Sequence, residues 1–296
     1  MVHGSCNEIQ FMEFTEQEKT TQERAKKYII DKKDDLIKKF ILDKKPLQIG
    51  MMSLFMAGSP GAGKTEFTNN YIQSQIDKND KDLQKILQKR SININEVNNL
   101  FIKIDVDEIR SFIPQYKKTD KNKGQKGNAE VIQAAANKGL DILRDYCLNN
   151  DISFLHDGTF GNYKTMRGLV KDSLSKGRIV QINYIYLDPL VAWEFTKARE
   201  FLEGRNINKD KFIPQFFDSQ KNVDEIKKEF GDNVKVHCIL KYSKDGVNLA
   251  LEKLDIAKFS YDISFNEPSV ARFLEIKYNA NVIKRYTKED LSDLLR

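Results

Sequence analysis

The spacing of hydrophobic residues along the chain changes near residue 50. Before that point, charges of both signs alternate and apolar residues recur at helical intervals, which predicts one or two surface helices. After it, short apolar runs alternate with stretches of helical period. Strands are expected at Met51–Ala57, Leu100–Asp105, Ile152–His156, Ile179–Leu187 and Val234–Tyr242. Helices are expected at Glu66–Ile76, Asp82–Gln88, Ala129–Asn149, Tyr163–Ser175, Pro189–Glu203 and Val223–Phe230.

This alternation predicts an α/β fold. Strands joined by helical crossovers form a parallel sheet with helices on both faces, and ligands bind where the strands end. The tail mixes a helix at 268–277 with two strand-like runs. We therefore expect a helical N-terminal extension over 1–50, a main α/β domain over 51–244 and an α+β appendage over 245–296 packed on it.

Composition excludes several classes of protein. Hydrophobic residues make up 40% of the chain and charged residues 31%, as in soluble globular proteins. No apolar run approaches the roughly 20 residues of a membrane span, and the N-terminus lacks a secretory pattern, so a cytoplasmic location is expected. The net charge of +6 is too mixed to indicate a nucleic-acid partner. Three scattered cysteines indicate neither a disulfide framework nor a zinc site.

The first predicted strand runs into a phosphate-binding P-loop of the pattern G-x-x-x-x-G-K-T. Its glycines permit a tight loop whose backbone N–H groups converge on phosphates, and the following helix N-terminus favours anions. Lysine in this pattern reaches the β- and γ-phosphates, and threonine holds Mg²⁺. The loop and its next residue are Gly58, Ser59, Pro60, Gly61, Ala62, Gly63, Lys64, Thr65 and Glu66.

Two aspartates follow the second predicted strand. If the strand continued through IDVDEIR, Asp105 and Asp107 would point to one side, towards the γ-phosphate. A carboxylate there can support Mg²⁺ or take a proton from an attacking hydroxyl. The alternative is that Asp107 caps a helix that begins with Glu108.

The third predicted strand ends in HDGTF. Asp157 and Thr159, with Gly158 allowing a sharp turn, suit a site that grips a hydroxyl-rich acceptor; a plain Asp-Gly turn is the alternative. We expect His156 and His237 to be core or edge residues, because both lie within strand runs.

The helix after the fourth strand ends in a basic cluster. Cations beside a P-loop can neutralise the phosphoryl group in transfer, although cations at a helix C-terminus also satisfy its dipole. The cluster consists of Arg199, Arg205, Lys209 and Lys211.

The segments GSPGAGKT, IDVDEIR, HDGTF, KARE and KFIP, in this order, resemble the zeta toxin family of P-loop kinases from about Met51 to about Tyr242. The resemblance implies transfer of the γ-phosphate of ATP, with Mg²⁺, to the 3′-hydroxyl of UDP-N-acetylglucosamine or a related UDP-amino sugar. Many members of the family are toxins restrained by a small antitoxin protein, so such a partner is implied as well.

The resemblance also assigns roles to individual residues. Lys64 and Thr65 match the phosphate- and Mg²⁺-binding positions, and Asp107 matches the catalytic base. Asp157 matches the acidic residue that binds the sugar nucleotide, beside Thr159. Asp141, on the helix before this strand, matches a further acidic contact to the acceptor. Three cations are also candidates for the site. Arg199 matches the first family arginine, and either Lys211 or Arg205 supplies the second cation.

One departure concerns the acceptor. A basic residue often follows the family's Gly-Thr, whereas here Phe160, Gly161 and Asn162 precede Lys164. A kinase for a nucleoside, an antibiotic or a polynucleotide 5′-end therefore stays open, as does a binding protein switched by a nucleotide.

Overall fold

A computed structural model describes residues 14–46, 51–68, 101–118, 127–203, 207–243 and 259–295. Six strands form one sheet in the order β2-β3-β1-β4-β5-β6, and every neighbouring pair is parallel except β5 with β6. The strands are β1 (Met52–Ala57), β2 (Ile102–Asp105), β3 (Phe154–Asp157), β4 (Ile179–Tyr186), β5 (Val234–Ser243) and β6 (Phe259–Ser264).

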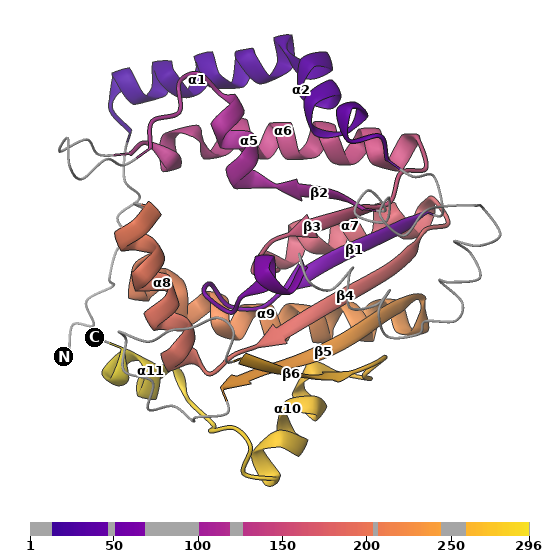
Figure 1. The fold of residues 1–296 in the computed structure, drawn as a ribbon, viewed down its shortest axis with the longest axis vertical. Helices are drawn as coiled ribbons and strands as arrows, with labels where there is room; N and C mark the ends of the chain where they lie inside the picture. Colours follow the sequence, from indigo (N-terminus) through magenta and orange to yellow (C-terminus); the bar gives the residue numbers. More distant parts are fainter. Residues whose placement is uncertain are drawn as a thin grey trace, which may run out of the picture.

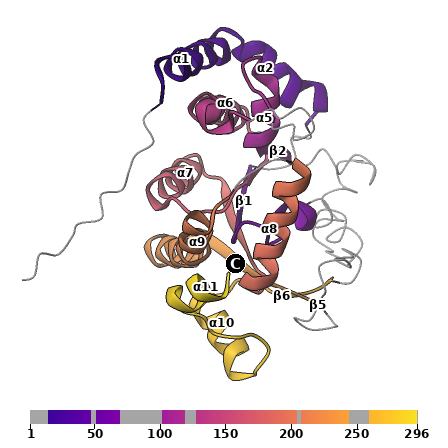
Figure 2. The same ribbon diagram turned by 90° about the vertical axis from the view of Figure 1, so that its left-hand side faces the viewer.

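The helices lie against both faces of this sheet. Figure 2 shows α7 and α9 on one face and α8 on the other. The predicted α/β fold, of the P-loop NTPase type, is thereby confirmed. The helices are α1 (Glu16–Asp31), α2 (Lys33–Phe40), α5 (Val106–Phe112), α6 (Ala129–Asn149), α7 (Tyr163–Ser175), α8 (Pro189–Glu203), α9 (Lys209–Phe230), α10 (Val270–Asn279) and α11 (Lys288–Leu294).

The N-terminal helices α1 and α2 cover α6, at the β2 edge of the sheet (Figure 1). Thr15 starts α1 with a capping box, in which its side chain and that of Glu18 each accept the other's backbone N–H. Ile29 and Leu36 are fully buried, so one stripe of each helix joins the core while its charged residues face water. The helical extension expected at the N-terminus is confirmed.

The core strand β1 is buried along nearly its whole length, as expected for a strand with neighbours on both sides and helices on both faces. On β2, by contrast, Ile102 and Ile104 are buried while Lys103 and Asp105 are half-buried. This alternation places Lys103 and Asp105 together on one side of the sheet.

A buried arginine holds the other ends of the central strands. Arg178, which is 3% exposed, donates hydrogen bonds to Ser53 Oγ at 2.8 Å, to Ile152 O at 2.6 Å and to Met52 O at 3.0 Å. These acceptors lie on or just before β1 and β3. The guanidinium thus supplies hydrogen bonds to buried acceptors at this end of the sheet.

Two sequence-based expectations are wrong. The strand after residue 100 stops at Asp105, whose side chain accepts the backbone N–H of Asp107 at 2.9 Å and so caps α5. Asp105 and Asp107 therefore do not lie on one strand face, and Asp105 rather than Asp107 is the cap. Helix α9 begins at Lys209, not at Val223, because Asn208 caps it and Pro214 is accommodated inside.

The C-terminal part extends the sheet. Strand β6 pairs antiparallel with β5, α10 begins two residues later than expected, and α11 was not predicted. The helix after the P-loop is described only as far as Thr68, and Asp82–Gln88 lies outside the described residues. The division into extension, main domain and appendage remains a prediction. None of the described helices is both long enough and apolar enough to cross a lipid bilayer.

Candidate active site

The P-loop lies between the carboxyl end of β1 and helix α8, towards which β1 and β4 point (Figure 1). Gly61 has a φ of +74°, and a Cβ atom there would lie 2.0 Å from the carbonyl oxygen of Ala192 on α8. Gly58 has a φ of +136°, and its Cβ would lie 2.5 Å from the carbonyl oxygen of Ile185. Only glycine fits either position, because both the conformation and the close contact exclude a side chain.

Lys64 folds back over this loop. Its ammonium donates hydrogen bonds to Gly58 O at 3.0 Å and Ser59 O at 2.7 Å. Burial of the ammonium lowers the pKa of Lys64 to about 8; the negative charge of Asp157 opposes the shift, and the positive charge of Arg199 adds to it. The structure therefore brings Lys64, Asp157 and Arg199 into one electrostatic environment.

Thr65 contacts the end of β3. Its hydroxyl donates to Asp157 Oδ2 at 2.9 Å, although the two residues are 92 positions apart in the sequence. The next loop is joined to the P-loop as well, because the backbone N–H of Gly58 donates to Thr159 O at 3.3 Å. The HDGTF segment is therefore joined to the P-loop by hydrogen bonds and is not an isolated turn.

Lys103 on β2 completes this group. Its ammonium lies 3.2 Å from Asp105 Oδ2 and 3.7 Å from Asp157 Oδ2. Asp105 and Asp157 face each other in the parallel register of β2 and β3, so the lysine separates two neighbouring carboxylates. Sequence reasoning missed Lys103, because it reads as one polar position in an apolar strand.

Arg199 lies on the side of α8 that meets the P-loop. Gly61 packs against Ala192 and Thr196, and residues 192, 196 and 199 follow one another on a single helix face. The charge of Arg199 therefore acts on Lys64 from the helix that packs against the loop, and its part in a site stays a prediction.

Asp107 lies in the first turn of α5, where β2 ends. Arg110 donates to Asp107 Oδ1 and also to Gln133 Oε1 on α6, and the carboxylate is 26% exposed. Since β3 lies between β2 and β1, the carboxylate starts about two strand spacings, roughly 10 Å, from the P-loop strand.

Three other predicted residues lie elsewhere or are not described. Lys211 Nζ pairs with Glu130 Oε1 at 2.8 Å, and both side chains are more than half exposed. Arg144 donates to Asp141 Oδ1 at 3.0 Å on α6, and within the described residues Asp141 makes no hydrogen bond or ion pair with the P-loop. Arg205 lies outside the described residues.

Glu66 connects the helix after the P-loop to two strands at the edge of the sheet. Its carboxylate accepts from Lys241 Nζ at 2.6 Å and from Tyr261 OH at 3.1 Å. Lys241 is 2% exposed and lies 4.5 Å from the ring centre of Phe259. The P-loop helix is thereby tied to β5 and β6, a contact that the sequence pattern did not predict.

His156 is a buried residue beside the site. Burial lowers its pKa to about 4, with a smaller effect from the charge of Arg144, so the imidazole is neutral at physiological pH. His237 on β5 is also buried. Within the described residues, no group of three or more histidine, cysteine or acidic side chains is arranged to hold a metal ion.

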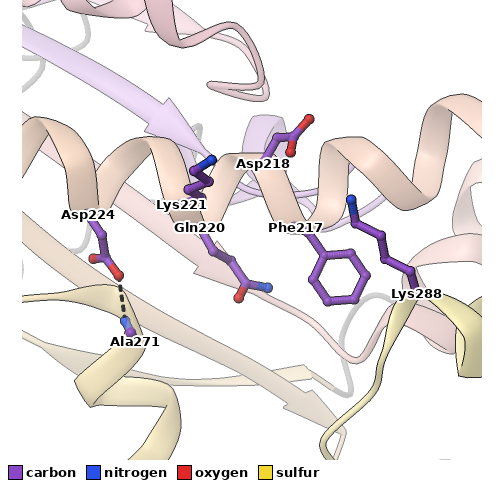
Figure 3. A pocket seen from close by; sticks show the side chains of 7 residues that line it. All are labelled: Phe217, Asp218, Gln220, Lys221, Asp224, Ala271 and Lys288. Atoms are coloured by element: carbon purple, nitrogen blue, oxygen red, sulfur yellow. Dashed lines mark hydrogen bonds between the residues drawn. The ribbon is translucent and has the colours of Figure 1, made fainter.

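A pocket of about 410 Å³ lies between α9, α10 and α11, and none of the predicted site residues lines it (Figure 3). Asp224 caps α10 there, accepting the backbone N–H groups of Val270 at 2.5 Å and Ala271 at 3.0 Å. Burial raises the pKa of Asp224. Lys288 Nζ lies 6.0 Å from the ring centre of Phe217. We assign this pocket to the packing of the C-terminal helices.

The fold and the loop define a protein of the P-loop NTPase class. The family model named Zeta toxin matches residues 38–250, which is more than half of the chain. The protein therefore belongs to the zeta toxin family, and membership in it indicates a kinase-like phosphotransferase. Comparison with curated protein sequences finds no match.

Solved structures share the fold. One, from the PezAT chromosomal toxin–antitoxin system of Streptococcus pneumoniae, has 16% identity, covers 96% of this chain and 93% of its own, and has a TM-score of 0.50. The AvrRxo1-ORF1:-ORF2 structure with ATP has 10% identity, covers 90% of this chain and 75% of its own, and has a TM-score of 0.52. Another AvrRxo1 structure, with sulphate ions, has 11% identity, covers 86% and 72%, and has the same TM-score.

The residues present fit a nucleotide with a divalent cation. Glycines whose positions admit no side chain, the half-buried Lys64 and a helix N-terminus form a phosphate cradle. Thr65, beside Asp157, supplies oxygen atoms of the type that Mg²⁺ prefers.

Proposed function

We propose that this protein is an ATP- and Mg²⁺-dependent kinase of the zeta-toxin type that phosphorylates a hydroxyl of a UDP-amino sugar such as UDP-N-acetylglucosamine. The arrangement of the P-loop, in which the charges of both Asp157 and Arg199 act on Lys64, carries the proposal. It joins a phosphate cradle to a second cation, as phosphoryl transfer requires. Membership in the zeta toxin family supports the same reaction.

Each residue in this proposal has one role. Lys64 and Arg199 balance the charge of the phosphoryl group during transfer, and Thr65 holds the cation. Asp107 accepts the proton of the acceptor hydroxyl. The acceptor oxygen bonds to the γ-phosphorus, the bond from that phosphorus to the β–γ bridging oxygen breaks, and ADP leaves. Bound Mg²⁺ supplies charge neutralisation on the phosphate oxygens.

In this proposal the acceptor binds over the end of β3. Asp107 on one side and the P-loop on the other bracket the segment that contains Asp157 and Thr159. Hydroxyl-rich acceptors suit this segment, because it offers carboxylate, hydroxyl and backbone groups. We also propose Asp141 as a more distant acceptor contact, and Arg205 or Lys211 as a second cation brought in when substrates bind.

The proposed setting is a cytoplasmic toxin with a small antitoxin as partner. The PezAT structure belongs to a toxin–antitoxin system, and family membership extends the proposal to this chain. Expression without the antitoxin is expected to arrest growth of the host, and Lys64→Ala is expected to relieve the arrest. A harmless wild type would favour a metabolic kinase instead.

The test is transfer of label from γ-labelled ATP to a panel of acceptors: UDP-N-acetylglucosamine, nucleosides, an antibiotic set and a 5′-hydroxyl oligonucleotide. We expect labelled UDP-sugar with wild type, and a loss of about 10²- to 10⁴-fold in turnover with Asp107→Asn, whose ATP affinity is retained. Label on another acceptor would support a kinase but show that its acceptor is not a UDP-amino sugar. Free phosphate alone would indicate a nucleotide-switched binding protein.

A further inference from the structure

Lys241 is a buried cation that lies against the P-loop. Its side chain is 2% exposed, and a Cβ atom on Gly63 would lie 2.5 Å from Lys241 Nζ. The same Cβ would lie 3.2 Å from Glu66 Oε2. The ion pair between Lys241 Nζ and Glu66 Oε2, 2.6 Å apart, is therefore formed directly beside the backbone of the loop.

Three aromatic rings surround the ammonium of Lys241. The ring centres of Phe259, Phe195 and Tyr261 lie 4.5, 5.6 and 5.9 Å from its Nζ atom. We call these three rings the aromatic cage. A cation is attracted to the face of such a ring, most strongly where water is excluded. The cage and the carboxylate of Glu66 together replace the water that a buried ammonium loses.

Two of the three rings come from β6, which lies beside β5 at the edge of the sheet (Figure 1). Lys241 on β5 pairs with Tyr261 in the antiparallel register, and Phe259 lies on the same face of β6. The hydroxyl of Tyr261 also donates to Glu66 Oε1 at 3.1 Å. Strand β6 begins after residue 250, where the match to the zeta toxin family ends. A segment outside the matched region therefore contacts the helix after the P-loop.

The position of Glu66 makes its charge important for phosphate binding. Glu66 is the third residue of the helix that begins at Lys64, and the N-terminus of a helix attracts anions. A carboxylate in this first turn takes up part of that attraction and repels an incoming phosphate group. The ammonium of Lys241, paired with the same carboxylate, balances its charge.

We propose that Lys241, held by the aromatic cage, is a positioning residue of the nucleotide site, which neutralises Glu66 and thereby lets the P-loop accept a polyphosphate. This rests on the proposed function, because it assumes that the loop binds ATP. It also gives β6 a part in nucleotide affinity, through the two rings that hold the lysine.

The experiment measures the dissociation constant of a non-hydrolysable ATP analogue by titration calorimetry in low salt. Lys241→Met leaves the carboxylate of Glu66 without this counter-charge, and we expect the dissociation constant to rise about tenfold, as one unit charge near several phosphate charges implies. The rise should be smaller for AMP, which carries fewer charges. Lys235→Met removes an exposed lysine from the same strand and is expected to leave both constants at the wild-type values.

Two further variants separate charge from packing. Glu66→Gln removes the repelling charge and is expected to bind the analogue at least as tightly as wild type. Lys241→Met combined with Glu66→Gln is expected to return the dissociation constant to within about threefold of the wild-type value. If the ion pair served packing alone, each single change would weaken binding and the combination would not restore it. Neither variant leaves this carboxylate unpaired, so both remain informative if Lys241→Met does not fold.

The part of β6 is tested by Phe259→Leu, which removes the ring nearest to the ammonium. We expect the dissociation constant of the analogue to rise about threefold, because the lysine is held less firmly. Phe265→Leu, a change of the same chemistry at a side chain that is 58% exposed, should have no effect. Equal constants for the two variants would overturn the part assigned to β6.

Equal affinities of wild type and Lys241→Met for the analogue, or weaker binding by Glu66→Gln, would overturn the proposal. Failure of the proposed function gives a different result. A wild type that binds the analogue, with the variants in the expected order, yet transfers no phosphate to any acceptor, would refute the kinase and leave the role of Lys241 intact. A wild type that does not bind the analogue would refute both.

Discussion

The lowered pKa of Lys64 predicts that nucleotide binding weakens in alkaline solution. Without a nucleotide, burial holds the pKa of Lys64 at about 8. Bound phosphates are negative and stabilise the charged form, so binding raises this pKa and takes up a proton wherever the free lysine is neutral. At pH 9 about nine tenths of the free lysine is neutral, and charging it costs about 1.4 kcal/mol.

We therefore expect the dissociation constant of Mg²⁺-free ATP to rise about tenfold between pH 7 and pH 9. Calorimetry in buffers of different ionisation enthalpy would show an uptake approaching one proton per ATP at pH 9. The second ionisation of a phosphate has a pKa of about 6, so the ligand's charge is nearly constant over this range. Lys64→Met should remove the pH dependence, whereas Lys171→Met on the exposed face of α7 should not. A wild-type affinity that is constant from pH 7 to pH 9 would show that Lys64 is already charged, or stays neutral, throughout this range.

Further predictions concern stability. Gly61→Ala should lower the melting temperature and abolish nucleotide binding, because its Cβ would lie 2.0 Å from a carbonyl oxygen of α8. Gly168→Ala lies inside α7, where nothing is within 4 Å of the added Cβ, and should raise the free energy of unfolding by about 0.5 to 1 kcal/mol. Equal melting temperatures for the two variants would contradict this account. Arg178→Met should lower the free energy of unfolding by at least about 3 kcal/mol in urea denaturation, since it leaves several buried acceptors unpaired. Arg285→Met removes an exposed ion pair and should change this free energy by less than about 1 kcal/mol.

Local signals predicted much of the fold. The bounds of α6, α7 and α8 coincide with the predicted ones, because each has a long apolar stripe and a clear start. Asn162, for example, caps α7 by accepting the N–H of Thr165 at 2.9 Å. The start of α9 was missed because Pro214 follows an apolar pair and reads as a turn, although proline near a helix start leaves most of the helix hydrogen bonds intact.

The sequence predicts those parts of the site that lie in one continuous segment of the chain. The P-loop is one local segment, so its spacing alone indicates the phosphate cradle. The contacts of Thr65 with Asp157 and of Glu66 with Lys241 join residues 92 and 175 positions apart. Periodicity cannot show such contacts, because they follow from the order of the strands in the sheet. Lys103 was missed for the same reason: its partner Asp157 lies on another strand.

The most direct test of the central claim is mass spectrometry of UDP-N-acetylglucosamine after incubation with the protein, ATP and Mg²⁺. We expect the sugar nucleotide to gain the mass of one phosphoryl group and ADP to form in equal amount. Asp107→Asn, with the same affinity for ATP, should yield almost no product. The proposed reaction would be contradicted if the sugar nucleotide stayed unmodified and Asp107→Asn consumed ATP at the wild-type rate.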